Sequence, residues 1–288
     1  MRTEKEMLDL VINTARDDDR IRAVILNGSR ANPNAPPDPF QDYDIVYIVT
    51  DPLPFRKNME WIAGFGERMI LQIPEDMQDP PQVEDSRFTY LMQFMDGNRI
   101  DLSICPLVLL DDVLKDSLTI ILLDKDDLIP LLNPPTERDY FPKPPTTRAF
   151  DDCCNEFWWV SIYVAKGLWR SEILYALKFY ESTLRVELMK MLTWLVGVKT
   201  DFRSNPGKYG KYMQQYLPAE MWDLLLKTYP GANSDEIWAA FFVMCDLFRY
   251  AARQVADHFK YTYPLGDDRR VTAFLRHVWE MPPGADEI

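Results

Sequence analysis

LNGSRANPNAPPDPFQDYDIVYIV, residues 26–49, joins two apolar segments through a glycine-serine turn and a loop that is rich in proline. The first segment, IRAVILNG, reads as a buried strand that ends at Gly28, and the four prolines of ANPNAPPDPFQ indicate a loop. The second strand, YDIVYIV, is equally apolar, yet Asp42 and Asp44 stand at its start. Because residues two apart on a strand point to the same face, these carboxylates are expected to project together.

Two neighbouring carboxylates repel each other unless a cation lies between them. Ligation by oxygen alone favours magnesium, so Asp42 and Asp44 predict a Mg2+ site, the alternative being that both acids end the loop and face water. The Gly28-Ser29 turn favours the site, because a glycine backbone can approach a phosphate closely and the Ser29 hydroxyl can donate to it. Arg30 adds a fixed positive charge, although the turn also fits a plain helix cap.

A third carboxylate, Asp101, interrupts the apolar strand NRIDLSIC. This strand follows RFTYLMQFM across Asp96-Gly97-Asn98, a strong hairpin signal, and one arm of the hairpin is able to lie beside the Asp42–Asp44 strand. Three carboxylates at one sheet edge are the arrangement of two-metal nucleotidyl transfer. Asp42 and Asp44 would bridge both ions, and Asp101 would complete the second site and serve as general base, an acid of the helical half being the alternative base.

The composition narrows the class of protein. The chain has 288 residues and a net charge of -13, which disfavours a nucleic-acid partner and suits a small cationic substrate. Four cysteines without a CxxC pair indicate neither a zinc site nor a disulfide framework, and two histidines leave little material for a catalytic triad. With no signal peptide and no long apolar run, the sequence favours a cytoplasmic protein without membrane contact. We expect a monomer or a weak homodimer.

The coarse organisation is α+β, with a boundary near residue 148. Before it, strands and helices alternate and predict a first domain, residues 1–148, with a small mixed β-sheet and flanking helices. After a second proline-rich segment, long helical periods predict a helical bundle as the second domain, residues 149–288. The expected helices are 3–18, 55–68 and VLLDDVLKD in the first domain, and 150–169, 171–196, 218–228 and 234–260 in the second.

Two groups of side chains in the helical half are candidates for binding. On a helix, Asp152, Glu156, Trp159 and Tyr163 form a stripe of carboxylates and aromatic rings that suits a cationic sugar; the alternative is a solvated first turn followed by core. The candidates for phosphate contact are Lys166, at the apparent helix end before Gly167, and the pair in NPGKYGKYM, Lys208 and Lys211. The alternative for Lys166 is that it complements the charge of the helix C-terminus. The alternative for Lys208 and Lys211 is that both are solvated in a surface loop.

The Gly28-Ser29 turn, the twelve-residue gap to Asp42-x-Asp44 and the later strand carboxylate resemble the nucleotidyltransferase superfamily of the DNA polymerase β type. Longer strings resemble the aminoglycoside 6-adenylyltransferases, which adenylylate streptomycin, and the resemblance covers roughly residues 1–265. Those strings are RIRAVILNGSR, FQDYDIVYIVTD, DGNRIDL and RAFDDCCNEFWWVSIYVAKG.

The resemblance implies an enzyme with a nucleotidyltransferase domain, residues 1–148, and a helical substrate-binding domain, residues 149–288. Such an enzyme binds ATP and magnesium and transfers AMP to the 6-hydroxyl of streptomycin, releasing pyrophosphate and inactivating the antibiotic. Streptomycin carries two guanidinium groups, which suit an acidic chain because charge-assisted hydrogen bonds to carboxylates are strong. The alternatives are transfer to another acceptor, namely a lincosamide, another aminoglycoside or a protein hydroxyl, and a non-catalytic nucleotide-binding protein.

Overall fold

The structure is a computed structural model that describes residues 1–77, 87–282 and 284–285. Its contacts divide the chain into two compact units, Met1–Asp139 and Tyr140–Ile288. The division falls inside the second proline-rich segment, and the Tyr261 hydroxyl donates a 2.8 Å hydrogen bond to the Pro145 carbonyl within the second unit. We propose that the two units correspond to the expected domains 1–148 and 149–288.

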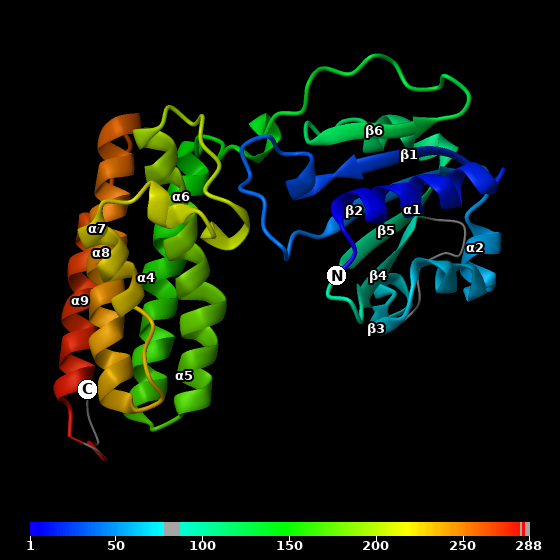
Figure 1. Cartoon of the computed structure of the whole chain (residues 1–288). Helices are drawn as coiled ribbons and strands as arrows, with labels where there is room; N and C mark the ends of the chain where they lie inside the picture. The colour runs from blue at the N-terminus through cyan, green and yellow to red at the C-terminus, as the bar shows by residue number, and fades with distance from the viewer. Residues whose placement is uncertain (78–86, 283, 286–288) are drawn as a thin grey trace. The chain divides into compact units, whose positions relative to one another are not determined.

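The first unit is built on a six-stranded mixed sheet in the order β3-β4-β5-β2-β1-β6 (Figure 1). Strands β2 and β5 pair in parallel, and the other neighbours pair antiparallel. The structure confirms the expected α+β class, both strands around the proline-rich loop, the β4–β5 hairpin and the strand at LTIILLD. The strands are β1 (Ile21–Asn27), β2 (Tyr43–Val49), β3 (Arg68–Gln72), β4 (Phe88–Phe94), β5 (Arg99–Pro106) and β6 (Thr119–Asp124).

The two faces of this sheet are covered differently. Helix α1 (Glu4–Asp17) packs on the first face, where the Tyr47 hydroxyl donates a 2.6 Å hydrogen bond to the Val11 carbonyl. On the second face, a smaller apolar cluster joins β1 and β2 to the short helix α3 (Leu110–Val113). Successive side chains of a strand point to opposite faces, so the sequence neighbours of a residue on the first face point to the second face.

The helices expected in the first unit are shorter than the sequence pattern indicates. Within residues 55–68, helix α2 covers Leu53–Lys57, a 3-10 segment covers Glu60–Phe65, and β3, which was not expected, begins at Arg68. Gly66 adopts φ +121°, outside the helical region, and this ends the 3-10 segment. In VLLDDVLKD only the four residues of α3 form an α-helix.

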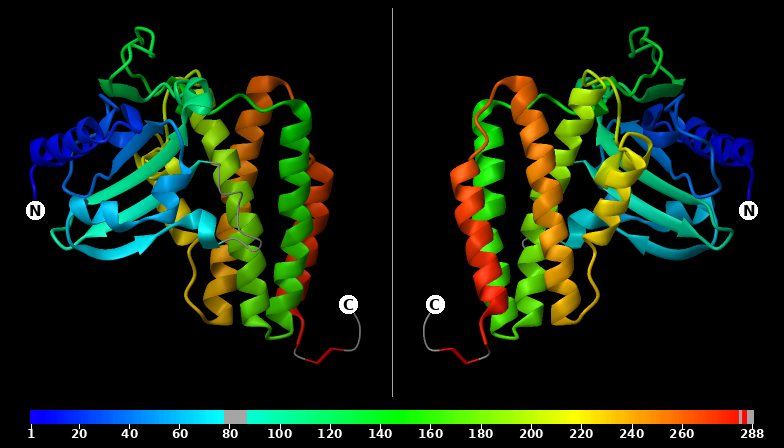
Figure 2. Two further views of the ribbon diagram at one scale, coloured as in Figure 1. Left: turned by 90° about the vertical axis from the view of Figure 1, so that its right-hand side faces the viewer. Right: turned by 90° about the vertical axis from the view of Figure 1, so that its left-hand side faces the viewer.

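The second unit is a bundle of helices, in which α4 lies beside α9 and α6 lies beside α8 (Figure 2). The Thr146 side chain caps α4 by accepting a hydrogen bond from the Ala149 N–H, and the Asn233 side chain caps α8 in the same way from Glu236. The helices are α4 (Thr147–Trp169), α5 (Ile173–Phe179), α6 (Arg185–Lys199), α7 (Ala219–Lys227), α8 (Ser234–Phe259) and α9 (Leu265–Glu280).

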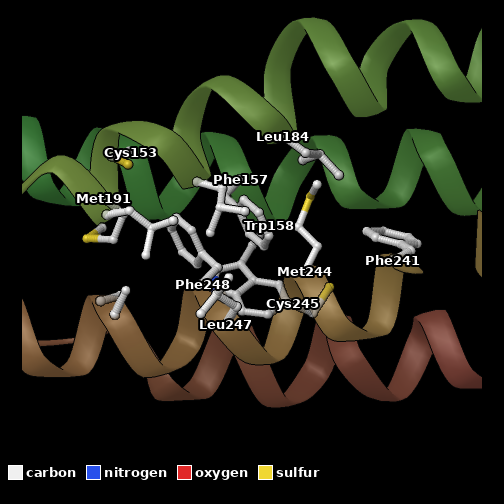
Figure 3. Close-up of a cluster of buried hydrophobic side chains, with 14 of the residues drawn as sticks. Cys153, Phe157, Trp158, Leu184, Met191, Phe241, Met244, Cys245, Leu247 and Phe248 are labelled. Atoms are coloured by element: carbon white, nitrogen blue, oxygen red, sulfur yellow. The ribbon is translucent and has the colours of Figure 1, made fainter. Parts of the chain in front are cut away.

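Aromatic packing fills the centre of the bundle. Phe157 of α4 stacks on Phe248 of α8 with ring centroids 3.8 Å apart, and the Trp158 ring packs edge-on against both (Figure 3). The four cysteines are free and buried; Cys153, Cys154 and Cys245 belong to the bundle core.

Two details of the bundle differ from the sequence pattern. The helix expected at residues 171–196 runs without a break from Ile173 to Lys199, but a π-helical turn, Tyr180–Leu184, lies within it between α5 and α6. Gly167 does not end α4, which continues to Trp169. A Cβ at Gly167 would lie 2.9 Å from the Tyr175 ring, so this glycine serves the close approach of α5 and not helix termination.

In the described ranges 1–77, 87–282 and 284–285, no helix combines the length and the hydropathy that crossing a membrane requires.

Candidate active site

The parallel pairing of β2 and β5 brings the predicted carboxylates together. Asp44 stands directly opposite Asp101 in the register. Their chain neighbours Tyr43, Ile45 and Ile100 belong to the core on the first face, so both carboxylates point to the second face. With Asp42, one residue before β2, they form the group that we call the acidic cluster, which consists of Asp42, Asp44 and Asp101.

Burial and neighbouring negative charge disfavour the ionised forms of Asp42 and Asp44, and a cation would favour those forms. Burial in the first place, and then the charges of Asp101 and Asp42, raise the pKa of Asp44 from 3.8 to about 6. Burial also raises the pKa of Asp42. The charges of Arg99 and Arg30 lower this pKa, whereas the charge of Asp101 raises it further. The three carboxylates form a donor set that consists of oxygen alone, and such a set fits Mg2+.

Arg99, at the start of β5, supplies the nearest cationic group. Its Nε and Nη2 donate to the two oxygens of Asp101 at 2.7 and 2.9 Å, and its Nε lies 3.7 Å from Asp42 Oδ2. Among the residues that the structure describes, no three His, Cys, Asp or Glu side chains already have the geometry of a metal site. Sequence reasoning missed Arg99, although its place two residues before Asp101 puts it on the same strand face.

Gly28 is required by its neighbour Asp44. It adopts φ +72°, and a Cβ at this position would lie 2.0 Å from Asp44 Oδ2. The turn thus provides space for a carboxylate of the acidic cluster. The expectation that Gly28 also allows close approach of a phosphate stays a prediction.

The other two residues of the turn have different surroundings. Ser29 is half-buried in a 3-10 turn that ends β1. The Arg30 guanidinium stacks on the Tyr43 ring, 3.8 Å from its centroid, and donates a 2.9 Å hydrogen bond to the Gln41 carbonyl. Arg30 therefore contacts the residues on either side of Asp42. The predicted contact with phosphate would require the Arg30 guanidinium to move off the Tyr43 ring.

A fourth acid, Asp116, contributes to the field at Asp44, whose pKa it helps to raise. It lies in the loop before β6, where its side chain accepts a 2.9 Å hydrogen bond from the Leu118 N–H. The sequence offered no signal for this proximity, because the β1–β6 pairing that carries Asp116 toward Asp44 joins segments far apart in the chain.

In the second unit, the predicted carboxylate and aromatic stripe lies on α4. The Trp159 indole donates a 2.8 Å hydrogen bond to the Tyr163 hydroxyl, and Asp152 is exposed, 3.6 Å from Arg148. A hollow of about 480 Å³ opens beside this stripe. Trp159 lines it, whereas Asp152, Glu156 and Tyr163 do not. The wall consists of Asp151, Cys154, Asn155, Trp158, Trp159, Ile162, Pro264, Asp267, Arg270 and Val271.

The three predicted lysines also belong to the second unit. Lys166 is half-buried near the end of α4. Lys208 and Lys211 are exposed; Lys208 begins a 3-10 turn, Lys208–Gly210, that includes Tyr209 at φ +57°, and Lys211 follows it. The Lys208 ammonium lies 5.3 Å from the centroid of the Tyr209 ring, and that of Lys211 lies 4.9 Å from the centroid of the Tyr212 ring. Their predicted contact with phosphate stays a prediction.

Comparison with known proteins gives full-length matches. The sequence profile of a family described as streptomycin adenylyltransferase matches residues 1–278. Aminoglycoside 6-adenylyltransferase from Campylobacter jejuni is 47% identical over 93% of this chain and 93% of that protein, and the Bacillus subtilis protein of the same name is 42% identical over 97% and 99%. The crystal structure of an aminoglycoside 6-adenyltransferase from Bacillus subtilis matches 98% of this chain and 100% of that one, at 36% identity and a TM-score of 0.49.

Proposed function

Because the chain belongs to the streptomycin adenylyltransferase family, we propose that it transfers AMP from ATP to the 6-hydroxyl of streptomycin. The observation that carries the proposal is the parallel register that sets Asp44 opposite Asp101, beside Asp42 and the Gly28 turn. This is the carboxylate arrangement that the sequence predicts for two-metal nucleotidyl transfer.

In the proposed reaction, the acceptor hydroxyl oxygen attacks the α-phosphorus of ATP and the bond from that phosphorus to the bridging oxygen of pyrophosphate breaks. Asp42, Asp44 and Asp101 would hold two Mg2+ ions, which neutralise phosphate charge and lower the pKa of the acceptor hydroxyl when bound. Asp101 is our candidate for the group that receives the hydroxyl proton. Pyrophosphate leaves, and AMP remains on the antibiotic.

The substrates would be held mainly by charge. The Gly28-Ser29 turn, Lys166, Lys208 and Lys211 are the proposed contacts of the triphosphate. Asp152, Glu156, Trp159 and Tyr163, on a chain of net charge -13, are the proposed contacts of the cationic acceptor. Positioning and charge neutralisation would then supply most of the catalysis.

Product analysis tests the proposed function. Purified protein incubated with ATP, Mg2+ and streptomycin is expected to release pyrophosphate and add the mass of one AMP to streptomycin, with NMR placing it on the 6-hydroxyl. AMP on a lincosamide or another aminoglycoside alone would reassign the acceptor. ATP binding without pyrophosphate release, across all acceptors, would indicate a non-catalytic nucleotide-binding protein.

Replacing Gly28 with alanine is expected to lower AMP transfer by about a hundredfold, because the new Cβ must push the Asp44 carboxylate aside. The positive φ at Gly28 adds a stability loss of about 1 to 2 kcal/mol. Gly64→Ala is the matched control, since nothing lies within 4 Å of a Cβ there. Steady-state rates and thermal melting separate the two effects, and a Gly28→Ala enzyme of normal activity would refute this role of the glycine.

A further inference from the structure

We propose that Arg99 competes with divalent cations for the acidic cluster, so that metal binding requires its guanidinium to withdraw from Asp101. The inference rests on the proposed function, in which the cluster carboxylates are the metal ligands. It concerns what the cluster does before nucleotide and metal arrive, and it makes Arg99 a positioning residue that acts through Asp101.

The first support is the geometry of the ion pair. The guanidinium uses Nε and Nη2 to engage both oxygens of Asp101, at 2.7 and 2.9 Å, as a planar fork. The same Nε lies 3.7 Å from Asp42 Oδ2, so one cation faces two of the three carboxylates. Arg99 thus occupies the position from which an ion would attract these acids, while the described acids lack a ready-made metal geometry.

The second support is the balance of charge. The acidic cluster carries up to three negative charges, and Arg99 neutralises one of them at short range. A divalent ion that binds Asp101 while the fork is in place meets a positive charge within a few ångströms, which opposes its binding. The guanidinium does not lose its proton at any ordinary pH, so it can only yield by moving.

The third support is the freedom of Arg99 to move. Its side chain is 38% exposed, in contrast to a structural fork buried in a core. It also lines a hollow of about 620 Å³ on the side of β5 away from β2, together with Leu91 and Gln93 of β4. This hollow offers room, and the polar side chain of Gln93, to a guanidinium that has left Asp101.

The consequence is coupling between metal and nucleotide. In the free protein, Arg99 holds the carboxylates together and keeps their affinity for metal low. The phosphates of ATP bring further oxygen ligands for the metal ion. They also bring negative charge, which offsets the positive charge of Arg99 and favours the withdrawal of its guanidinium from Asp101. Metal and nucleotide are therefore expected to bind with positive cooperativity.

The test measures binding of Mn2+ to the protein without ATP or acceptor, by the electron paramagnetic resonance signal of free Mn2+. Arg99→Met is expected to bind Mn2+ about tenfold more tightly than wild type, and Arg99→Lys, which keeps the charge and loses the fork, is expected to fall between them. Arg22→Met is the matched control, because it removes a comparable fork to Asp126 at the opposite end of β1 from the acidic cluster. This control is expected to leave Mn2+ affinity unchanged.

Thermal melting provides a second readout. Without metal, Arg99→Met is expected to melt below wild type, because the acids lose their counter-charge, and Mg2+ is expected to raise its melting temperature more than that of wild type. Equal or weaker Mn2+ binding by both Arg99 variants would overturn the inference. If Asp44→Asn still lowers Mn2+ affinity in that case, the metal site of the proposed function survives. If Asp44→Asn has no effect on Mn2+ binding, both fail.

Discussion

Asp44→Asn is expected to lower kcat/KM for AMP transfer by about a thousandfold or more while the protein stays folded. The amide keeps the shape of the side chain but removes the charge that, in the proposed function, binds both metal ions. Asp44 lies opposite Asp101 and is pressed against Gly28, so no neighbouring acid can take its place without a change of backbone. Asp101→Asn is expected to show a loss of the same order.

Kinetics and circular dichroism together check this result. Asp112→Asn is a suitable control, since Asp112 of α3 is 63% exposed and pairs with Lys115. The control is expected to retain wild-type turnover. An Asp44→Asn or Asp101→Asn enzyme within tenfold of wild type would show that the acidic cluster is not the catalytic centre, and the metal assignment would fall with it.

Asp268→Ala is expected to cause the largest loss of stability, about 3 to 5 kcal/mol in the free energy of unfolding. Asp268 is 1% exposed at the start of α9 and accepts hydrogen bonds of 2.6 and 2.7 Å from Arg249 of α8. It also accepts 2.9 Å from the Tyr263 hydroxyl, which in turn accepts 3.2 Å from the Trp158 indole of α4. The alanine would leave Arg249 without its buried counter-charge and loosen α9 from both helices.

Asp246→Ala is the matched control, because Asp246 pairs with the same arginine at 2.6 Å but is 72% exposed. Its loss is expected to stay below about 1 kcal/mol. Urea unfolding followed by circular dichroism measures both variants. Equal losses in the two would mean that burial of the ion pair does not determine its contribution.

The pH dependence of this pair has a definite sign. Burial raises the pKa of Asp268, but the hydrogen bonds from Arg249 and Tyr263 more than offset it, so the pKa lies below 3.8. A lowered carboxylate pKa stabilises the fold fully above the unfolded value and loses that contribution as pH falls through the folded value. The stability difference between wild type and Asp268→Ala is therefore expected to be constant near neutral pH and to shrink below about pH 3.8.

Much of the fold followed from local patterns in the sequence. The apolar run YDIVYIV, the Asp-Gly turn and the long helical periods indicated strands, a hairpin and a bundle correctly, because these depend on neighbours within a few residues. Local patterns did not predict strand β3 or the π-helical turn at Tyr180–Leu184, since both depend on packing against elements elsewhere in the chain. The prediction that the helix ends at Gly167 is wrong, because the sequence does not show that α5 packs against this glycine.

For the candidate site, the sequence alone determined which residues are acids and which strand face each of them occupies, because side chains alternate along a strand. The tertiary structure decided that Asp44 meets Asp101, that Gly28 makes room for Asp44, and that the Arg99 fork holds Asp101. The physical reason is that strand register and side-chain partners are set by packing between segments far apart in the chain, which local periodicity does not encode.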